Sequence, residues 1–402
     1  MKTDTFKLCL PAIAITVQNN AAALILPPFL HDLKFPVAAI GSLMSLGPVL
    51  ALASRLPTGM AYNRRRARVL LSLAILAMAA CNFLYSLVTN AVSFGLVHAA
   101  SGFAYGASTT LYMAFYVDSL PADENRSHAM GYYVGSLAVG YSIGNFLAGY
   151  LADRLGYGAT FYAAALLALA ALVLIALIKS PQTGAAREER QRTAAMGLRR
   201  SLKTALEPNV AAIVTVALFL NMLHQVGNVF LPLYGLSIGL SLTQVGVIRA
   251  LYSLCNAVTR PLSGLVVQRL GHRRLSYGGL PLQSALMMLV PLLSDFAALT
   301  ALYVSAGFVR AVALVSNAVG LVEDIDEAKI SRGVATGLYN AAGDLGNILG
   351  PTAGGFVASV AGVAGLFVVA PLGAALLFLA TIGLVHWRWE ERAVHSGRGA
   401  QD

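Results

Sequence analysis

Long apolar stretches alternate with short polar segments along almost the entire chain. A helix that spans a membrane needs about 20 consecutive, mostly apolar residues. Six stretches in each half of the chain meet this requirement: 8–30, 37–61, 69–89, 92–117, 127–151 and 158–178, then 209–233, 243–267, 275–293, 297–321, 332–357 and 363–386. The pattern therefore predicts an all-α membrane protein with twelve transmembrane helices.

One long polar segment, SPQTGAAREERQRTAAMGLRRSLKTALEP at 180–208, interrupts this pattern in the middle of the chain. The two sides of it repeat each other at a constant spacing of about half the chain: Gly41 with Gly246, Arg55 with Arg260, Gly59 with Gly264 and Arg64 with Arg269. Such self-similarity indicates an internal duplication. We therefore expect two pseudo-symmetric six-helix bundles, at 1–180 and 209–402, joined by a cytoplasmic linker at 181–208.

The composition excludes a soluble protein. Of 402 residues, 57% are hydrophobic and only 11% are charged, and the mean hydropathy is +0.70. A soluble chain of this length would need far more charge to cover its surface. Cys9, Cys81 and Cys255 are scattered through apolar sequence, so they indicate neither a disulfide framework nor a metal site. The sequence contains no Walker motif and no HExxH motif, so it supports neither ATP-driven pumping nor enzyme function.

The basic residues predict the orientation of the helices. The net charge of +10 could suggest nucleic-acid binding, but the Lys and Arg residues cluster in short loops on one side of the predicted topology. Only Lys34 and Arg154 fall in loops on the other side. By the positive-inside rule, both termini face the cytoplasm. The N-terminal segment has no small-residue cleavage site, so we interpret it as the first membrane helix rather than a removed signal peptide.

Polar side chains at mid-depth in the first, fourth, seventh and tenth helices predict the path of a solute. Such groups are costly in lipid, so they should face a cavity. The predicted substrate-binding residues are Arg310, Arg249, His224, Gln225, Asn20, Tyr105, Tyr112 and Asn317. Among them, Arg249 could draw an anionic solute into the path. Arg55 and Arg260, one turn before the repeated glycines, should instead extend to the cytoplasmic interface.

Arg310 and Asp344 are expected to form an ion pair inside the membrane. Each lies near the middle of its predicted helix, and a lone charge there costs roughly 2.5–3.5 kcal/mol. Asp344 is the leading candidate for a proton carrier, with His98 and His224 behind it. The alternative is a purely structural ion pair.

A sequence motif follows the second helix of each half. It reads GMAYNRRRAR from Gly59 to Arg68, and its second copy reads GLVVQRLGHR from Gly264 to Arg273. With two six-helix halves and a long central loop, the sequence resembles the major facilitator superfamily over essentially its whole length. In that family, an acidic residue and arginines of the motif latch the two halves together on the cytoplasmic side.

The resemblance assigns a gating role to the matching positions: Gly59, Asn63, Arg64, Arg68, Gly264, Gln268, Arg269 and Arg273. Asn63 and Gln268 stand where the family has an acidic residue. A neutral amide can still hydrogen-bond a helix terminus, but the charged latch is weakened. The alternative is that the arginines only fix the topology.

Two further matches resemble the proton-coupled efflux branch of the family. The residues from Gly350 to Gly355 look like the Gly-Pro-x-x-Gly-Gly element of antiporters, although it lies in the eleventh helix and Asn145 replaces the Pro in the fifth. His98 stands where the family often has an Arg before a Gly, and His can exchange a proton near neutral pH. The alternatives are a glycine packing seam and a His98 bonded to a backbone carbonyl.

We therefore expect a secondary active transporter that works by alternating access, with proton-coupled export of small organic molecules as the leading function. One alternative is proton-coupled uptake of an anionic or metal-chelating solute, such as an organic acid or siderophore. Another is a non-transporting receptor or scaffold. The expected partners are a small-molecule substrate, protons and the lipid bilayer, without nucleic acid, cofactor or metal. We expect a monomer in a bacterial inner membrane.

Overall fold

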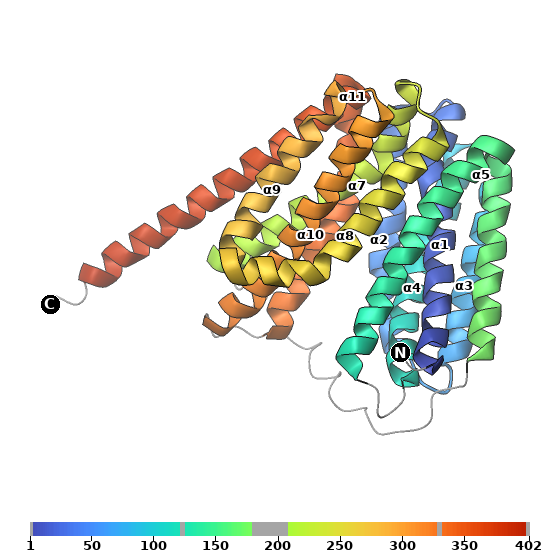
Figure 1. The fold of residues 1–402 in the computed structure, drawn as a ribbon, viewed down its shortest axis with the longest axis horizontal. Coiled ribbons are helices and arrows are strands. Elements are labelled where there is room, and N and C mark those ends of the chain that lie inside the picture. The colour runs from blue at the N-terminus through green and yellow to red at the C-terminus, as the bar shows by residue number, and fades with distance from the viewer. Residues whose placement is uncertain (1–2, 121–124, 179–207, 328–331, 399–402) are drawn as a thin grey trace.

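The computed structural model describes residues 3–120, 125–178, 208–327 and 332–398, and every element in them is helical (Figure 1). The first half contains α1 (Thr3–Asp32), α2 (Val37–Ala61), α3 (Ala67–Tyr85), α4 (Ala91–Ser119) and α5 (Arg126–Leu177). The second half contains α7 (Pro208–Ser237), α8 (Leu242–Leu270), α9 (His272–Met288), the 3₁₀ turn η2 (Val290–Leu292), α10 (Phe296–Glu327) and α11 (Arg332–Arg398). Residues 181–207 of the expected linker lie outside the described residues.

Two of these helices, α5 and α11, each contain two membrane spans. The backbone leaves helical geometry at Gly156 in α5 (φ 82°) and at Gly362 in α11 (φ 76°), a conformation that glycine adopts at little cost. Their apolar stretches contain 50 and 48 residues. At 1.5 Å per residue each would measure about 70–75 Å, more than twice the hydrocarbon thickness of a bilayer. Counted this way, the described helices match the twelve predicted spans.

Eight apolar stretches in the described residues are long enough to cross a membrane, including these two double-length ones. The helices α4 and α8 are not among them. Both carry polar side chains along their length, such as His98 in α4 and Arg249 and Arg260 in α8. The fold is thus an all-helical membrane fold.

The two halves meet along two seams of small residues. On one seam, Gly41 of α2 lies against the Pro351 carbonyl and Gly355 of α11. On the other, Gly149 and Gly246 bring α5 and α8 together: Gly149 contacts the Leu242 carbonyl and Gly246 contacts the Asn145 carbonyl. A Cβ at Gly41, Gly149 or Gly246 would collide with backbone atoms of the other half, so glycine permits this close approach.

The halves approach each other at the end where α2 and α8 begin, and they diverge toward the end where the N-terminus lies (Figure 1). At the diverging end, a Cβ added to Gly131 or Gly135 of α5, or to Gly337 of α11, would meet nothing within 4 Å. The conformation is therefore closed at the expected outer end and open toward the expected cytoplasmic end.

Candidate functional site

The side chain of Arg249 lies inside the second bundle, 7% exposed, and is held by Asn228 of α7. Its guanidinium group donates to the Asn228 backbone carbonyl at 3.2 Å and to the Asn228 side-chain oxygen at 3.1 Å. A guanidinium has five N–H donors. The remaining donors of Arg249 have no hydrogen-bond acceptor among the described residues.

A polar network continues from Asn228 along α7 and α8. The Asn228 amide nitrogen lies 2.6 Å from the Gln225 side-chain oxygen and 3.2 Å from His224 Nε2. The other ring nitrogen of His224 lies 3.1 Å from the Tyr252 hydroxyl, and the two rings stack with centroids 5.6 Å apart. Spacings of three and four residues place Arg249 with Tyr252, and His224 with Asn228, on shared helix faces.

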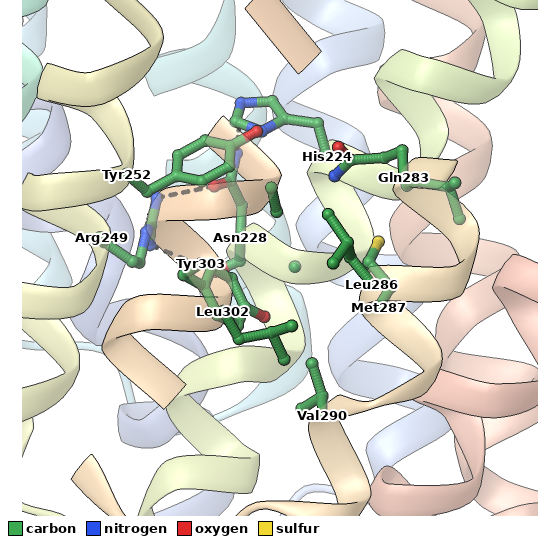
Figure 2. A pocket seen from close by; sticks show the side chains of 13 residues that line it. His224, Asn228, Arg249, Tyr252, Gln283, Leu286, Met287, Val290, Leu302 and Tyr303 are labelled. Atoms are coloured by element: carbon green, nitrogen blue, oxygen red, sulfur yellow. Dashed lines mark hydrogen bonds between the residues drawn. The ribbon is translucent and has the colours of Figure 1, made fainter. Parts of the chain in front are cut away.

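These residues border a small pocket between α7, α8, α9 and α10 (Figure 2). Its free volume is about 20 Å³, enough for about one water molecule. Tyr303 and Gln283 also line it, and neither was predicted from the sequence. The signal in the sequence for Gln283 is a polar glutamine within an apolar helix. The signal for Tyr303 is its position in α10, seven residues before Arg310.

Arg310, which is 5% exposed, does not pair with Asp344, so that prediction was wrong for this conformation. Its guanidinium group donates to the Leu220 carbonyl and, at 2.9 Å, to the Asn221 side-chain oxygen, both on α7. A predicted depth in the membrane does not determine which neighbour a helix face meets. Arg310 faces α7, whereas Asp344 faces α2.

Asp344 of α11 instead forms an ion pair with Arg55 of α2, at 2.5 Å. The pair joins the two halves of the molecule. The Asp344 side chain is 14% exposed and that of Arg55 is 48% exposed. The expectation that Arg55 extends to the cytoplasmic interface stays a prediction, and the structure shows a carboxylate of the other half within its reach.

Among the described residues, the charged groups that act on His224 are arginines, without a carboxylate. Arg249, Arg260 and Arg310 all lie close enough to act electrostatically on His224. None of the three forms an ion pair with a described residue. A proton on His224 would add another positive charge to this cluster, which favours a hydrogen-bonding role for the imidazole. Its predicted role in proton coupling stays a prediction.

Several other predicted substrate-binding residues have their polar groups engaged within the bundles. The Asn20 amide donates to the Thr16 carbonyl at 2.9 Å, and Tyr112, which is fully buried, donates to the Leu8 carbonyl. Asn317 donates to the Ile213 carbonyl at 2.9 Å and accepts from Ser276. The Asn20 contact lies within α1, whereas the contacts of Tyr112 and Asn317 fix helices to one another. Their predicted roles in binding stay predictions.

Tyr105 and His98 differ in how much freedom they retain. The half-buried Tyr105 has its hydroxyl 3.5 Å from that of Tyr141, on α5. Both ring nitrogens of the buried His98 have partners: Nδ1 lies 2.7 Å from the Tyr85 hydroxyl and Nε2 lies 3.3 Å from the Met44 carbonyl. A neutral imidazole satisfies both contacts, so the geometry favours His98 as a link between α2, α3 and α4.

The contacts described for the first motif include three within its own half. Arg64 donates to Asp118 at the end of α4, at 2.8 Å, and this hydrogen bond raises the pKa of Arg64. Arg68 donates to the Ile178 carbonyl, and the Asn63 side chain accepts from the Arg65 backbone N–H at 3.0 Å. A Cβ at Gly59 would meet only Thr110, at 3.9 Å.

The second motif is more open. Gln268, Arg269 and Arg273 are exposed, and a Cβ at Gly264 would meet nothing within 4 Å. Within this motif, His272 Nδ1 lies 2.7 Å from the Glu323 carboxylate of α10. Glu323 occupies the position equivalent to Asp118 in the first half. The gating roles of both motifs stay predictions.

No group of three or more His, Cys, Asp or Glu side chains in the described part of the chain is arranged to hold a metal ion. The polar groups that converge in the second bundle are instead guanidinium, amide, imidazole and phenol groups. Such groups recognise a solute by charge and hydrogen bonding. They offer no activated nucleophile.

Comparison with known proteins identifies the family. The model of the Major Facilitator Superfamily matches residues 8–328 and 228–401. No curated protein matches the chain. A bacterial homologue of the human lysosomal transporter Spinster, in an inward-facing and unoccupied conformation, is 14% identical with a TM-score of 0.73, over 95% of this chain and 94% of that one. The nucleoside transporter NupG is 15% identical with a TM-score of 0.80, over 95% of this chain and 99% of that one. Identities this low show the shared fold alone. The family match extends across almost the whole chain, so this protein belongs to the major facilitator superfamily and is a multi-pass membrane transporter rather than an enzyme.

Proposed function

We propose that this protein is a secondary active transporter that moves a small anionic organic solute by alternating access of its two bundles. The observation that carries the proposal is the burial of Arg249 and Arg310 with no carboxylate partner among the described residues. Buried charges in proteins are normally paired. An anionic solute supplies the missing negative charge.

The partners of the two arginines support this reading. Each guanidinium is held by a backbone carbonyl and an amide side chain of α7, groups that orient the charge without neutralising it. Arg260 lies on the same helix as Arg249 but is exposed, so it contributes no buried charge. The two buried guanidinium groups make the inner face of the second bundle attractive to anions.

Proton coupling is the second part of the proposal, and its leading residue is Asp344. Protonation of this carboxylate removes its charge and so weakens the ion pair with Arg55 that joins the two halves. A proton can thereby change how strongly the halves are held together. The proposed orientation places both termini in the cytoplasm of a bacterial cell, with the protein in the inner membrane.

Export, the leading expectation from the sequence, is one candidate for the direction of transport, and uptake is the other. The Gly-Pro-x-x-Gly-Gly element supports export through its position, since the Pro351 carbonyl and Gly355 lie in the seam between the halves. Flux measured in right-side-out and inside-out vesicles distinguishes export from uptake of the same solute.

A panel of matched acids and amides tests the anionic preference. We expect proteoliposomes to transport a labelled organic acid and to exclude the neutral amide of the same carbon skeleton. Arg249→Gln and Arg310→Gln should each reduce acid flux about tenfold or more, because a hydrogen bond to a charged group contributes about 1.5–3 kcal/mol. Arg260→Gln is the matched control, with flux expected within about threefold of the parent.

Folding is monitored in the same experiment by detergent-extracted yield. If Arg310→Gln is poorly produced, Arg310→Lys replaces it, because lysine retains the positive charge. Equal flux of acid and amide through the parent protein would contradict the proposal. Loss of flux in Arg260→Gln to the same extent as in Arg249→Gln would show a general effect of surface charge rather than a binding role.

A further inference from the structure

We propose that the pocket around Arg249 is a head-group subsite for an anion that carries a hydrogen-bond donor on the neighbouring atom, as a 2-hydroxy or 2-amino carboxylate does. This inference rests on the proposed function and names the chemistry of the solute more narrowly. It depends on Tyr303 and Gln283, which no sequence pattern assigned to binding.

Two buried polar atoms in this pocket have no partner. The Tyr303 hydroxyl and the Gln283 side-chain oxygen make no hydrogen bond with any described residue, although their residues are only 8% and 3% exposed. An unsatisfied buried polar group is costly and therefore rare. When two occur in one small pocket, they indicate a group that binds there and satisfies both.

The unsatisfied groups have complementary requirements. Arg249 and the Tyr303 hydroxyl can donate hydrogen bonds, whereas the Gln283 side-chain oxygen can only accept one. Figure 2 shows Arg249 of α8 and Gln283 of α9 on opposite sides of the pocket. A carboxylate directed at Arg249 and Tyr303 leaves the adjacent carbon's hydroxyl or amino group to donate to Gln283. A plain carboxylate would leave the Gln283 oxygen unsatisfied.

The rest of the lining is apolar and determines how the subsite opens. Leu286, Met287, Val290 and Leu302 surround the polar atoms. In this conformation the pocket has room for about one water molecule, so a head group enters only when a lining side chain moves. Met287 is suited to that movement because its unbranched side chain adapts readily.

Two matched pairs of probes test the donor requirement. The first pair is lactate and propionate, and the second is 3-phenyllactate and 3-phenylpropionate, so each pair differs by one hydroxyl group. The measurement is ligand-induced thermal stabilisation of the purified full-length protein, with the neutral lactamide as the charge control. We expect half-saturating concentrations about tenfold lower for the hydroxy acid of at least one pair, and no stabilisation by lactamide.

Substitutions then locate the effect. Gln283→Leu should remove the preference for the hydroxy acid and leave the response to the plain acid unchanged. Tyr303→Phe should weaken both acids while leaving the stability of the ligand-free protein unchanged, since its hydroxyl has no protein partner. Tyr234→Phe is the matched control: its hydroxyl donates to the Val290 and Leu293 carbonyls at 3.1 Å, so its loss should lower stability without changing the ligand preference.

The outcomes distinguish this inference from the proposed function. Equal responses to hydroxy and plain acids in both pairs, or none to any acid, overturn the donor requirement. If both acids bind equally but lactamide does not, the anionic preference still stands. If lactamide binds as well as lactate, the proposed function itself is wrong. If Tyr303→Phe destabilises the ligand-free protein as Tyr234→Phe does, the pocket holds a structural water instead.

Discussion

The α2–α11 and α5–α8 seams occupy equivalent positions in the two halves but are held by different interactions. Both contain glycines against backbone carbonyls of the other half. Among the described residues, the α2–α11 seam has an ion pair, between Arg55 and Asp344, and the α5–α8 seam has none. In the repeat, Arg260 is the equivalent of Arg55 and Ala138 is the equivalent of Asp344, so the second seam lacks the carboxylate.

The α5–α8 seam has its own interaction at the expected outer end. The Asp153 carboxylate accepts hydrogen bonds from the backbone N–H groups of Leu242 and Thr243, at 3.0 and 2.7 Å, and so caps the start of α8 from the other half. The equivalent residue on the other seam is Ser359, whose hydroxyl donates to Phe356 in its own helix. One seam is thus fastened near its inner end and the other at its outer end.

This asymmetry indicates different functions for the two seams. Protonation can switch the Arg55–Asp344 pair, and Asp344 is only 14% exposed. The Asp153 cap lies among exposed residues and stabilises the closed outer end through the partial positive charge of a helix N-terminus. The duplication therefore produced two similar seams. They differ because each has one acidic residue that the other lacks, Asp344 in the α2–α11 seam and Asp153 in the α5–α8 seam.

The largest effect is expected from removing the switchable charge. Asp344→Asn retains size and hydrogen bonding but cannot titrate, so gradient-driven accumulation should be lost while solute exchange persists. Folding stability should change by no more than about 1 kcal/mol, because Arg55 is half exposed. Accumulation and exchange are measured in proteoliposomes with and without a proton gradient.

Arg55→Ala should reproduce this loss, and Arg260→Ala is its control at the equivalent position of the other seam. Normal accumulation in Asp344→Asn would show that the pair is only structural. Coupling would then have to be sought at His98 or His224.

An intermediate effect is expected at the outer end. Asp153→Ala removes the hydrogen bonds from the other half to the start of α8, where the Ser241 cap remains. Loss of such capping bonds costs about 1 kcal/mol, equivalent to roughly a fivefold shift toward outer opening. The measurement is the labelling rate of Ser142→Cys by a maleimide that cannot cross the membrane, in a protein whose Cys9, Cys81 and Cys255 are replaced by Ser.

Ser142 suits this purpose because its hydroxyl reaches the Ala250 carbonyl across the seam, at 3.1 Å. Asp295→Ala is the control, since Asp295 accepts from Ala298 at the start of α10 within one half. A labelling rate that rises equally in both variants would indicate general loosening rather than outer opening.

The smallest effect is expected from making the seams alike. Ala138→Asp places a carboxylate at the position equivalent to Asp344, where it should pair with Arg260 and hold the α5–α8 seam closed. An exposed ion pair contributes about 0.2–1 kcal/mol, so labelling of Ser142→Cys should slow by no more than a few-fold. Ala138→Asn separates the effect of charge from that of size, and identical rates in the two variants would exclude the pair.

The positions of the helices could be predicted from the sequence because a bilayer accepts so few structures. Backbone groups in hydrocarbon must bond within their own segment, so each long apolar stretch forms a helix. The duplication could also be predicted, since Gly41 and Gly246 recur at a constant spacing. The structure places both in seams between the halves.

The partners of the charged residues could not be predicted in the same way. Sequence position determines depth, at about 1.5 Å per residue, and on depth alone Arg310 and Asp344 were suitable partners. The sequence does not state how each helix is rotated or which helix it faces. The tertiary structure turns Arg310 toward α7 and Asp344 toward α2.

The same limit applies to the pocket. Arg249 and His224 stood out in the sequence because a charge or an imidazole is costly in a membrane helix. Tyr303 and Gln283 did not stand out, because in the sequence each could equally have found a hydrogen-bond partner within the protein. The sequence by itself determined the twelve spans, their duplication and the polar helices. Only the packing of α7, α8, α9 and α10 decided which polar groups converge and which of them lack a partner, because burial and hydrogen bonding depend on neighbours far apart in the chain.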